Sequence, residues 1–275
     1  MLKVAITGST GLIGSRMVKL LKDKIAFIPL TQADMNITDT GSVEKAISGI
    51  DFDVFLHLAG YTNVDQAEKT PGSAIALNVD GTRNVFNAVE AKNKKFVYIS
   101  TDFVFDGQSP PYNEESQPHP ISVYGQTKYD GENLVSGKAM IIRPSYPYRK
   151  EFEAKKDFVR TIKSLLEQKK PLTMVHDSLI TPTFIDDMVQ ATGYLLEHFS
   201  PETFHIVGSD SMSPYAAGKL IAKTFSLDSS LISPVSYNEY FKDKAKRPRY
   251  SDIKSIKNTF YQMKPFEDGL KAILS

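Results

Sequence analysis

The stretch "VAITGSTGLIGSRMVKLL" near the start of the chain constrains the fold more than any other feature. It passes from an apolar, β-branched run into a helical pattern through Gly8, Gly11 and Gly14, spaced G-x-x-G-x-x-G. The first glycine permits a tight turn, the second lets a pyrophosphate approach the backbone, and the third lets the helix pack closely on the strand. Free N–H groups at the helix start then face the phosphates. The stretch predicts a dinucleotide-binding turn, although a plain strand-to-helix turn has a similar sequence.

The first 145 residues continue this alternation of strand-like and helical patterns. The strand-like runs are apolar almost throughout, as in a parallel sheet buried on both faces, and they span 3–7, 25–30, 53–59, 95–100 and 139–143. Between the third and fourth runs, the spacing of Ile75, Val79, Phe86 and Val89 predicts one apolar helix face. The fold class expected is therefore α/β, with a doubly wound parallel sheet of the Rossmann type.

Beyond Pro147 the pattern changes, which suggests a second structural unit. Helical patterns over 157–168 and 214–225 stand among proline-bearing loops and short strands such as 203–207. We therefore expect a dinucleotide-binding domain over 1–147 and, over 148–275, mainly a smaller α/β lobe that binds substrate. A chain of 275 residues is long enough for both.

Composition limits the classes of partner. The net charge of +1 gives no electrostatic reason to expect nucleic acid or a membrane surface as a partner. No apolar run approaches the ~20 residues that cross a bilayer, and the N-terminus shows no secretory signal, so a cytoplasmic location is expected. The absence of cysteine excludes disulfides and thiolate metal sites.

The choice between NADPH and NADH depends on the end of the second strand. An acid there would hydrogen-bond the ribose hydroxyls of NADH, but this strand ends at Leu30-Thr31 and the first acid is Asp34. Arg16 lies in the first turn of the helix that follows the glycine loop. It could contact a 2′-phosphate or could be a solvated charge. NADPH is favoured, and NADH stays open.

Tyrosine–lysine pairs at a spacing of four are more frequent than expected. Residue frequencies predict about one Tyr-x-x-x-Lys by chance. The chain has five, namely Tyr124/Lys128, Tyr146/Lys150, Tyr215/Lys219, Tyr240/Lys244 and Tyr250/Lys254.

Only the Tyr124/Lys128 pair follows a strand of the predicted parallel sheet on a helical pattern. That strand brings Thr101 and Asp102 to its carboxyl end, where ligands of open α/β sheets bind. A phenol with a pKa of about 10 is a poor acid–base catalyst at neutral pH, but a nearby lysine ammonium lowers that pKa. We expect Tyr124, Lys128 and Thr101 to act together.

These motifs in combination resemble the extended short-chain dehydrogenases/reductases. Within them, the chain is most similar to the dTDP-4-dehydrorhamnose reductase family. The matching segments occur in the same order along the chain and are "LAGYTNVDQAE" (58–68), "STDFVFDG" (100–107), "PYNEE" (111–115), "VYGQTKYDGE" (123–132), "IIRPSYPY" (141–148), "TPTFIDDM" (181–188) and "RPRYSDI" (247–253).

This resemblance implies an NAD(P)H-dependent reduction of a 4-keto sugar nucleotide, with Thr101, Tyr124 and Lys128 as the catalytic triad. It also implies roles for two further groups of residues. The cofactor would contact the glycine loop, Leu12, Ile13, Asn36, Ile37, Ala59, Gly60 and Tyr61. The substrate would contact Asp102, Phe103, Tyr146 and Arg247. Members of the family often carry Asp at Asn36 and Trp at Tyr146, so the chain departs from the pattern at both sites.

Two other classes of protein with different functions have similar sequences. One is a sugar-nucleotide epimerase or dehydratase, although Phe103 stands where dehydratases carry the second acid of an Asp-Glu pair. The other is the regulatory β subunit of methionine adenosyltransferase, which resembles the same reductases and binds a partner enzyme. The sequence leaves open the sugar, the nucleotide, a homodimer and a metal in assembly.

Several charged residues outside these motifs have simpler interpretations. Asp65 and Glu68 fit a solvated helix start better than a paired-carboxylate site, and His57 fits a core histidine better than a ligand. Asp186-Asp187 fits a helix N-terminal pair, because no histidines or third acid cluster with it, so no metal site is predicted.

Overall fold

The computed structural model describes residues 1–274, and its main element is a six-stranded parallel sheet in the order β2-β1-β3-β4-β5-β9. The strands are β1 (Leu2–Thr7), β2 (Ile25–Leu30), β3 (Val54–His57), β4 (Lys95–Ile99), β5 (Met140–Arg143) and β9 (Thr203–His205). The first five lie within one or two residues of the predicted runs. The doubly wound α/β class is confirmed.

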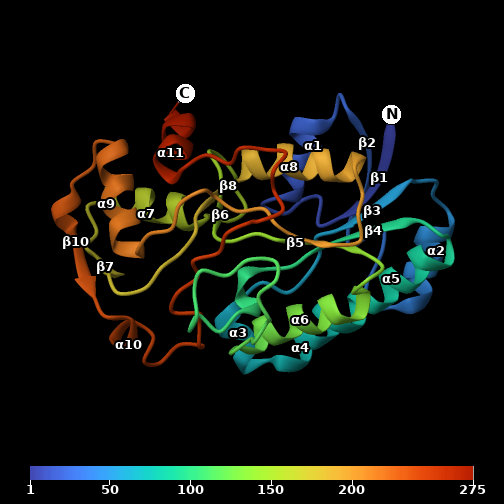
Figure 1. Ribbon diagram of the computed structural model, residues 1–275, viewed down its shortest axis with the longest axis horizontal. Coiled ribbons are helices and arrows are strands. Elements are labelled where there is room, and N and C mark those ends of the chain that lie inside the picture. The colour runs from blue at the N-terminus through green and yellow to red at the C-terminus, as the bar shows by residue number, and fades with distance from the viewer. Residues whose placement is uncertain (275) are drawn as a thin grey trace.

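Helices cover both faces of the sheet. One face carries α1 (Gly14–Leu21) and α8 (Ile185–Glu197), and the other carries α2 (Thr40–Ser48), α5 (Gly81–Ala91) and α6 (Val123–Val135) (Figure 1). Because side chains of a strand alternate between faces, β1 contributes to two cores. Val4 and Ile6 pack toward α1 and α8, and Ala5 packs toward the opposite layer.

The predicted helix face between β3 and β4 is buried at two of its four residues, and Val79 is half-buried. The segment consists of α3 (Val64–Lys69), α4 (Pro71–Ile75), a π-helical turn η1 (Ala76–Asp80) and α5. Phe86 and Val89 are buried as predicted, but Ile75 is 44% exposed. A π-helical turn has a longer repeat than an α-helix, so it changes which residues face inward. Asn78 is buried instead, with 1% exposure.

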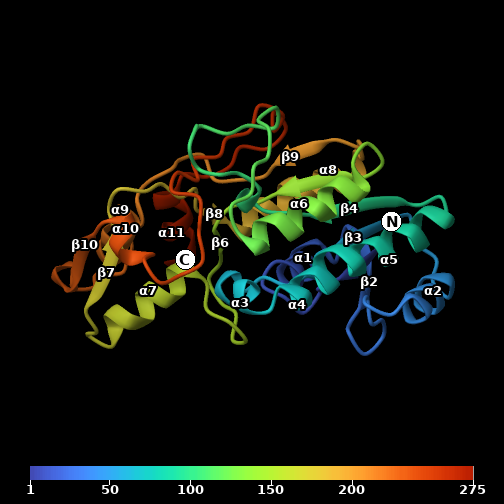
Figure 2. The same ribbon diagram turned by 90° about the horizontal axis from the view of Figure 1, so that it is seen from below.

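The C-terminal half contains a second group of elements beside the carboxyl ends of the sheet (Figures 1 and 2). Its strands form two parallel pairs, β6 (Pro147–Tyr148) with β8 (Thr183–Phe184) and β7 (Leu172–Val175) with β10 (Ile232–Val235). Its helices are α7 (Phe158–Glu167), α9 (Pro214–Thr224), α10 (Tyr237–Tyr240) and α11 (Phe266–Leu274), and the short 3-10 turns of the chain are η2 (Asp102–Val104) and η3 (Ser229–Leu231). Both helices expected here, α7 and α9, are present.

The chain returns to the main sheet within this half. After β8, helix α8 packs against α1, and β9 then pairs with β5 at the sheet edge. The short strand expected over 203–207 therefore belongs to the main sheet, whereas the sequence pattern suggested the smaller lobe. A division at residue 147 stays a prediction. No helix among residues 1–274 is long and apolar enough to cross a membrane.

Candidate active site

The glycine loop between β1 and α1 has no room for larger side chains at two positions. Gly8 has a φ of 67°, and a Cβ there would lie 2.9 Å from the carbonyl carbon of Leu58. A Cβ at Gly14 would lie 2.2 Å from the carbonyl oxygen of Gly8. Within residues 1–274, the backbone N–H groups of Leu12 and Ile13 donate to no acceptor. The loop therefore fits a pyrophosphate, because free N–H groups at a helix start bind phosphates.

The carboxylate of Asp34 lies closer to the end of β2 than the sequence spacing suggested. Asp34 follows the strand by several residues, yet its Oδ2 accepts hydrogen bonds from the Thr31 N–H (2.9 Å) and hydroxyl (2.6 Å). Asn36 accepts from the Thr38 N–H, whereas Ile37 is buried in the core against α5. An acid thus does lie at the strand end, where NADH-binding folds place one.

Arg16 is neither solvated nor free. Its Nε donates to Asp186 Oδ1 over 2.6 Å and its Nη2 donates to Oδ2 over 2.5 Å, so the guanidinium is paired with the first turn of α8. The hydrogen bonds to Asp186 raise the pKa of Arg16. A role for Arg16 toward a 2′-phosphate stays a prediction, and the ion pair competes with it.

The loop after β3 is fixed by Asn78. The Asn78 side chain accepts from the Tyr61 N–H (2.7 Å) and donates to the Tyr61 carbonyl (3.1 Å) and to the Thr127 hydroxyl (3.0 Å). These bonds join the predicted cofactor-lining segment Ala59–Gly60–Tyr61 to α6. None of the sequence motifs indicated Asn78, although a buried asparagine generally requires polar partners.

Helix α6 begins with two caps that place Tyr124 in its first turn. The Ser122 hydroxyl accepts from the Gly125 N–H over 3.1 Å, and Glu68 of α3 accepts from the Val123 N–H over 2.8 Å. Tyr124 is 9% exposed and packs edge-to-face on Phe103, with 5.5 Å between ring centroids. Burial raises the pKa of Tyr124 to about 12, although the nearby Thr101 hydroxyl opposes the rise.

Lys128 lies one turn further along α6 and points at the end of β4. Its Nζ donates to the Ile99 carbonyl over 2.7 Å and lies 4.0 Å from the ring centroid of Tyr98. Burial lowers the pKa of Lys128 to about 7, and the charge of Glu132 opposes this. Burial therefore outweighs any effect of Lys128 on the pKa of Tyr124 in this structure, and the expectation that Lys128 lowers this pKa stays a prediction.

Asp102 is the most enclosed acid of the site, with 3% exposure. Its carboxylate accepts hydrogen bonds from the hydroxyls of Thr101 (3.1 Å), Ser145 (2.8 Å) and Ser251. Burial raises the pKa of Asp102 although the three hydroxyls oppose it. Ser145 and Ser251 come from segments far apart in the chain, so no spacing in the sequence indicated that they meet.

Tyr146 and Arg247 approach the site from the C-terminal half. Tyr146 has a φ of 40°, packs edge-to-face on Phe158, and has a pKa raised by burial and by the charge of Asp102. Arg247 does not project freely, because its Nη2 donates to Asp65 Oδ2 over 2.8 Å. Its predicted contact with a substrate diphosphate stays a prediction.

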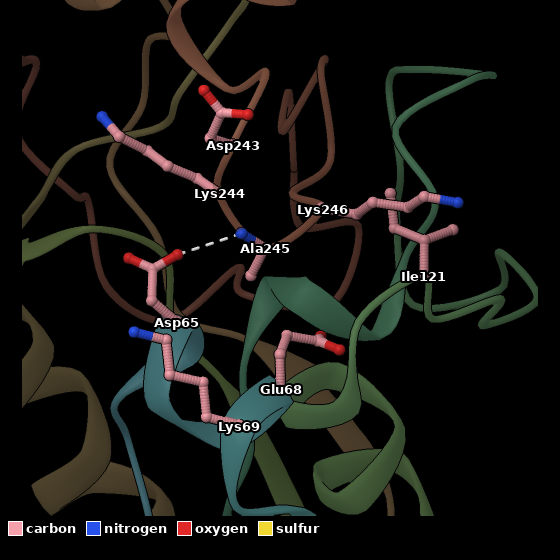
Figure 3. Close-up of a pocket in the computed structure, with 8 residues that line it drawn as sticks. All are labelled: Asp65, Glu68, Lys69, Ile121, Asp243, Lys244, Ala245 and Lys246. Atoms are coloured by element: carbon pink, nitrogen blue, oxygen red, sulfur yellow. Dashed lines mark hydrogen bonds between the residues drawn. The ribbon is translucent and has the colours of Figure 1, made fainter.

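Asp65 lines a cleft of about 690 Å³ that lies between α3 and segment 243–246 (Figure 3). Asp65 also accepts from the Ala245 N–H over 3.1 Å, which Figure 3 shows as a dashed line. Its side chain is 48% exposed. The solvated helix start expected at Asp65 is thus also a bridge between α3 and the C-terminal half.

The remaining polar residues have the structural roles expected of them. His57 is fully buried, and its two ring nitrogens hydrogen-bond the hydroxyls of Thr7 (2.8 Å) and Thr82 (3.3 Å), while burial lowers its pKa to about 3. Asp186 and Asp187 lie in the first turn of α8, as the helix N-terminal interpretation predicted.

The sequence matches the model of a known protein family over almost its whole length. The family described as "RmlD substrate binding domain" matches residues 2–275. The chain belongs to this family. The resemblance found in the sequence motifs is confirmed.

Three proteins that are similar to this chain illustrate the range of its relatives. The crystal structure of dTDP-4-dehydrorhamnose reductase from Bacillus anthracis in complex with NADP has a TM-score of 0.92 and 32% identity, covering 100% of this chain and 99% of that one. The spore coat polysaccharide biosynthesis protein SpsK of Bacillus subtilis is 32% identical over 91% of this chain and 88% of its own length. Methionine adenosyltransferase 2 subunit beta of Pongo abelii is 30% identical over 99% of this chain and 87% of its own.

Proposed function

We propose that this protein is an NADPH-dependent reductase of a 4-keto sugar nucleotide, with dTDP-4-dehydrorhamnose as the first substrate to test. Membership of the RmlD family and the similarity to a reductase that was crystallised with NADP support this proposal. The observation that carries it is the meeting of Thr101, Tyr124 and Lys128 at the carboxyl end of β4. The glycine loop with its unused N–H groups begins at the end of β1 in the same sheet.

A reduced nicotinamide, when bound, supplies the hydride that turns the ketone carbon into an alcohol carbon. The same reaction requires one proton on the ketone oxygen. Tyr124 is the proton donor in this proposal, and its raised pKa means that the phenol is fully protonated at neutral pH. Thr101 lies near Tyr124 and its hydroxyl donates to Asp102, so this hydroxyl is oriented before substrate arrives.

Lys128 and Asp102 have supporting roles in this arrangement. A methyl group placed on Gly60 would lie 3.9 Å from Lys128 Nζ, so the amine faces the loop that is predicted to line the cofactor. Asp102 binds three hydroxyls and thereby fixes the shape of the pocket around Thr101. Phe103 packs on the Tyr124 ring, which leaves no second acid beside Asp102 for an elimination.

The proposal is tested by following cofactor oxidation optically with a small panel of 4-keto sugar nucleotides, using NADPH and NADH in parallel. Turnover with at least one member, lost on Tyr124→Phe, is the expected result. Binding of cofactor without turnover of any member would contradict the reductase assignment.

A second candidate rests on the similarity to methionine adenosyltransferase 2 subunit beta, which extends over 99% of this chain. In that case the protein binds a partner enzyme and has little activity of its own. Copurification with a methionine adenosyltransferase from the same cells, without turnover of keto sugars, would favour this candidate.

A further inference from the structure

Arg149, which directly follows β6, reaches from the C-terminal half to the glycine loop. Its Nη1 donates to the Leu12 carbonyl over 2.9 Å and to the Ser15 hydroxyl over 2.9 Å. Ser15 in turn donates to the Gly11 carbonyl over 2.7 Å. One guanidinium group therefore bonds, directly or through Ser15, two carbonyls of the loop. None of the motifs in the sequence indicated this residue.

Arg149 is fixed at its other end as well. Its backbone N–H donates to Asp157 Oδ2 over 3.1 Å, and Asp157 is the N-cap residue of α7. The guanidinium carbon lies 5.2 Å from the ring centroid of Phe152, and the residue is 8% exposed. The side chain is thus held in one orientation toward the loop.

The peptide that Arg149 contacts also carries one of the unused donors. The Leu12 carbonyl and the Ile13 N–H belong to the same peptide unit, and among residues 1–274 the Ile13 N–H donates to no acceptor. A cation at the carbonyl oxygen polarises this unit, and hydrogen bonds in such a chain strengthen one another. Fixing the peptide before the ligand arrives also reduces the ordering that binding requires.

We propose that Arg149 is a positioning residue of the cofactor site. It holds the Leu12–Ile13 peptide so that the N–H faces the pyrophosphate of the dinucleotide, and it links cofactor affinity to the C-terminal half. This inference rests on the proposed function, because it assigns the glycine loop to a nicotinamide dinucleotide. It concerns the pyrophosphate, which NADPH and NADH share, and no other part of the cofactor.

The test is fluorescence titration of Arg149→Gln with NADPH and with NADH. The variant loses a charge-assisted contact, so Kd should rise about tenfold or more, by the same factor for both cofactors. Arg149→Lys keeps the cation and one donor, and should recover part of the affinity. Ser15→Ala removes one of the two acceptors and should give a smaller rise. If Arg149→Gln does not fold, the Kd of Ser15→Ala decides whether the inference holds.

Arg160→Gln is the matched control. Arg160 bonds Asp157 and the Phe152 carbonyl beside Arg149 but has no contact with the glycine loop, so its Kd values should change much less than those of Arg149→Gln. An unchanged Kd in Arg149→Gln and Ser15→Ala would overturn the inference. So would a loss confined to NADPH, which would point to the 2′-phosphate. Wild-type protein that binds neither cofactor would instead overturn the proposed function, and this inference with it.

Discussion

Helices α6 and α9 carry the same four-residue spacing of tyrosine and lysine but use it differently. On α9, Lys219 lies over the ring of Tyr215, 5.3 Å from its centroid, and donates to the nearby Ser229 carbonyl. On α6, Lys128 bonds the Ile99 carbonyl at the end of β4 and lies over the ring of Tyr98. The spacing alone therefore gives a shared helix face. We expect a functional pair only where that face meets a strand end of the sheet.

The largest effect that can break this comparison is on turnover. Tyr124→Phe removes the proposed proton donor and leaves the packing of the ring on Phe103, so reduction of a keto sugar nucleotide should slow by roughly 10²–10⁴. Tyr215→Phe makes the same chemical change on α9 and should leave turnover unchanged. Steady-state rates with a confirmed substrate measure both.

Thermal unfolding and NADPH titration accompany this pair of variants, since both should stay close to the wild type. Full turnover by Tyr124→Phe would mean that Tyr124 is structural and that the proposed mechanism is wrong.

The next effect concerns how firmly each helix is held. On α6, Glu132 forms a buried ion pair with Arg143 of β5 through two contacts of 2.8 and 2.6 Å, and both side chains are at most 6% exposed. Glu132→Ala leaves a buried guanidinium unpaired, so the free energy of unfolding should fall by about 3–5 kcal/mol.

Lys219→Ala on α9 is the surface control for this change, and it should alter stability by at most about 0.5 kcal/mol. Urea unfolding of the two variants measures the difference. Equal losses would mean that the ion pair does not fix α6 to the sheet.

The sequence predicted the parts of the fold that have a local pattern and not those that depend on tertiary packing. Five parallel strands follow from apolar runs, since a strand buried on both faces tolerates few polar residues. The wrong face at Ile75 and the placement of β9 have a common cause. A π-helical turn and a return of the chain to the sheet both depend on tertiary packing, which leaves no periodic signal.

The candidate site shows a similar limit. Thr101, Tyr124 and Lys128 could be predicted because one strand and one helix carry all three. The two serines that bond Asp102, Ser145 and Ser251, could not be predicted, because single serines in distant segments form no sequence pattern. Arg16 was predicted from its place in the first turn of the glycine-loop helix and Arg247 from the family resemblance, yet each is paired with an acid from another part of the chain.

Arg247 offers a smaller effect that sharpens the comparison between the halves. If it binds the substrate diphosphate, Arg247→Ala should raise KM for the sugar nucleotide about 10- to 150-fold while Kd for NADPH stays level. The structure adds that Asp65 holds the same guanidinium, so substrate must compete with it. Asp65→Asn should therefore lower KM or leave it unchanged. A higher KM in Asp65→Asn would indicate that the bridge assembles the site.

The smallest effect is the pH dependence of stability that Lys128 should impose. Burial lowers its pKa to about 7 in the folded protein, against about 10.4 in the unfolded chain. Between these values the unfolded state binds more protons, so this lysine makes the wild type more stable as pH rises, and its cost is complete below pH 7.

Lys128→Met does not titrate. The stability of the variant relative to the wild type should therefore be greatest at pH 6 and smaller at pH 9, by roughly 1–3 kcal/mol. Urea unfolding at both pH values measures this change, and groups that do not interact with Lys128 cancel in the difference. Lys219→Met replaces the lysine at the matching position of α9 and is the control. A difference for Lys128→Met that is constant from pH 6 to pH 9 would mean that the amine is solvated. In that case Lys128 would not be fixed against the Ile99 carbonyl, and the two helices would differ less than their contacts indicate.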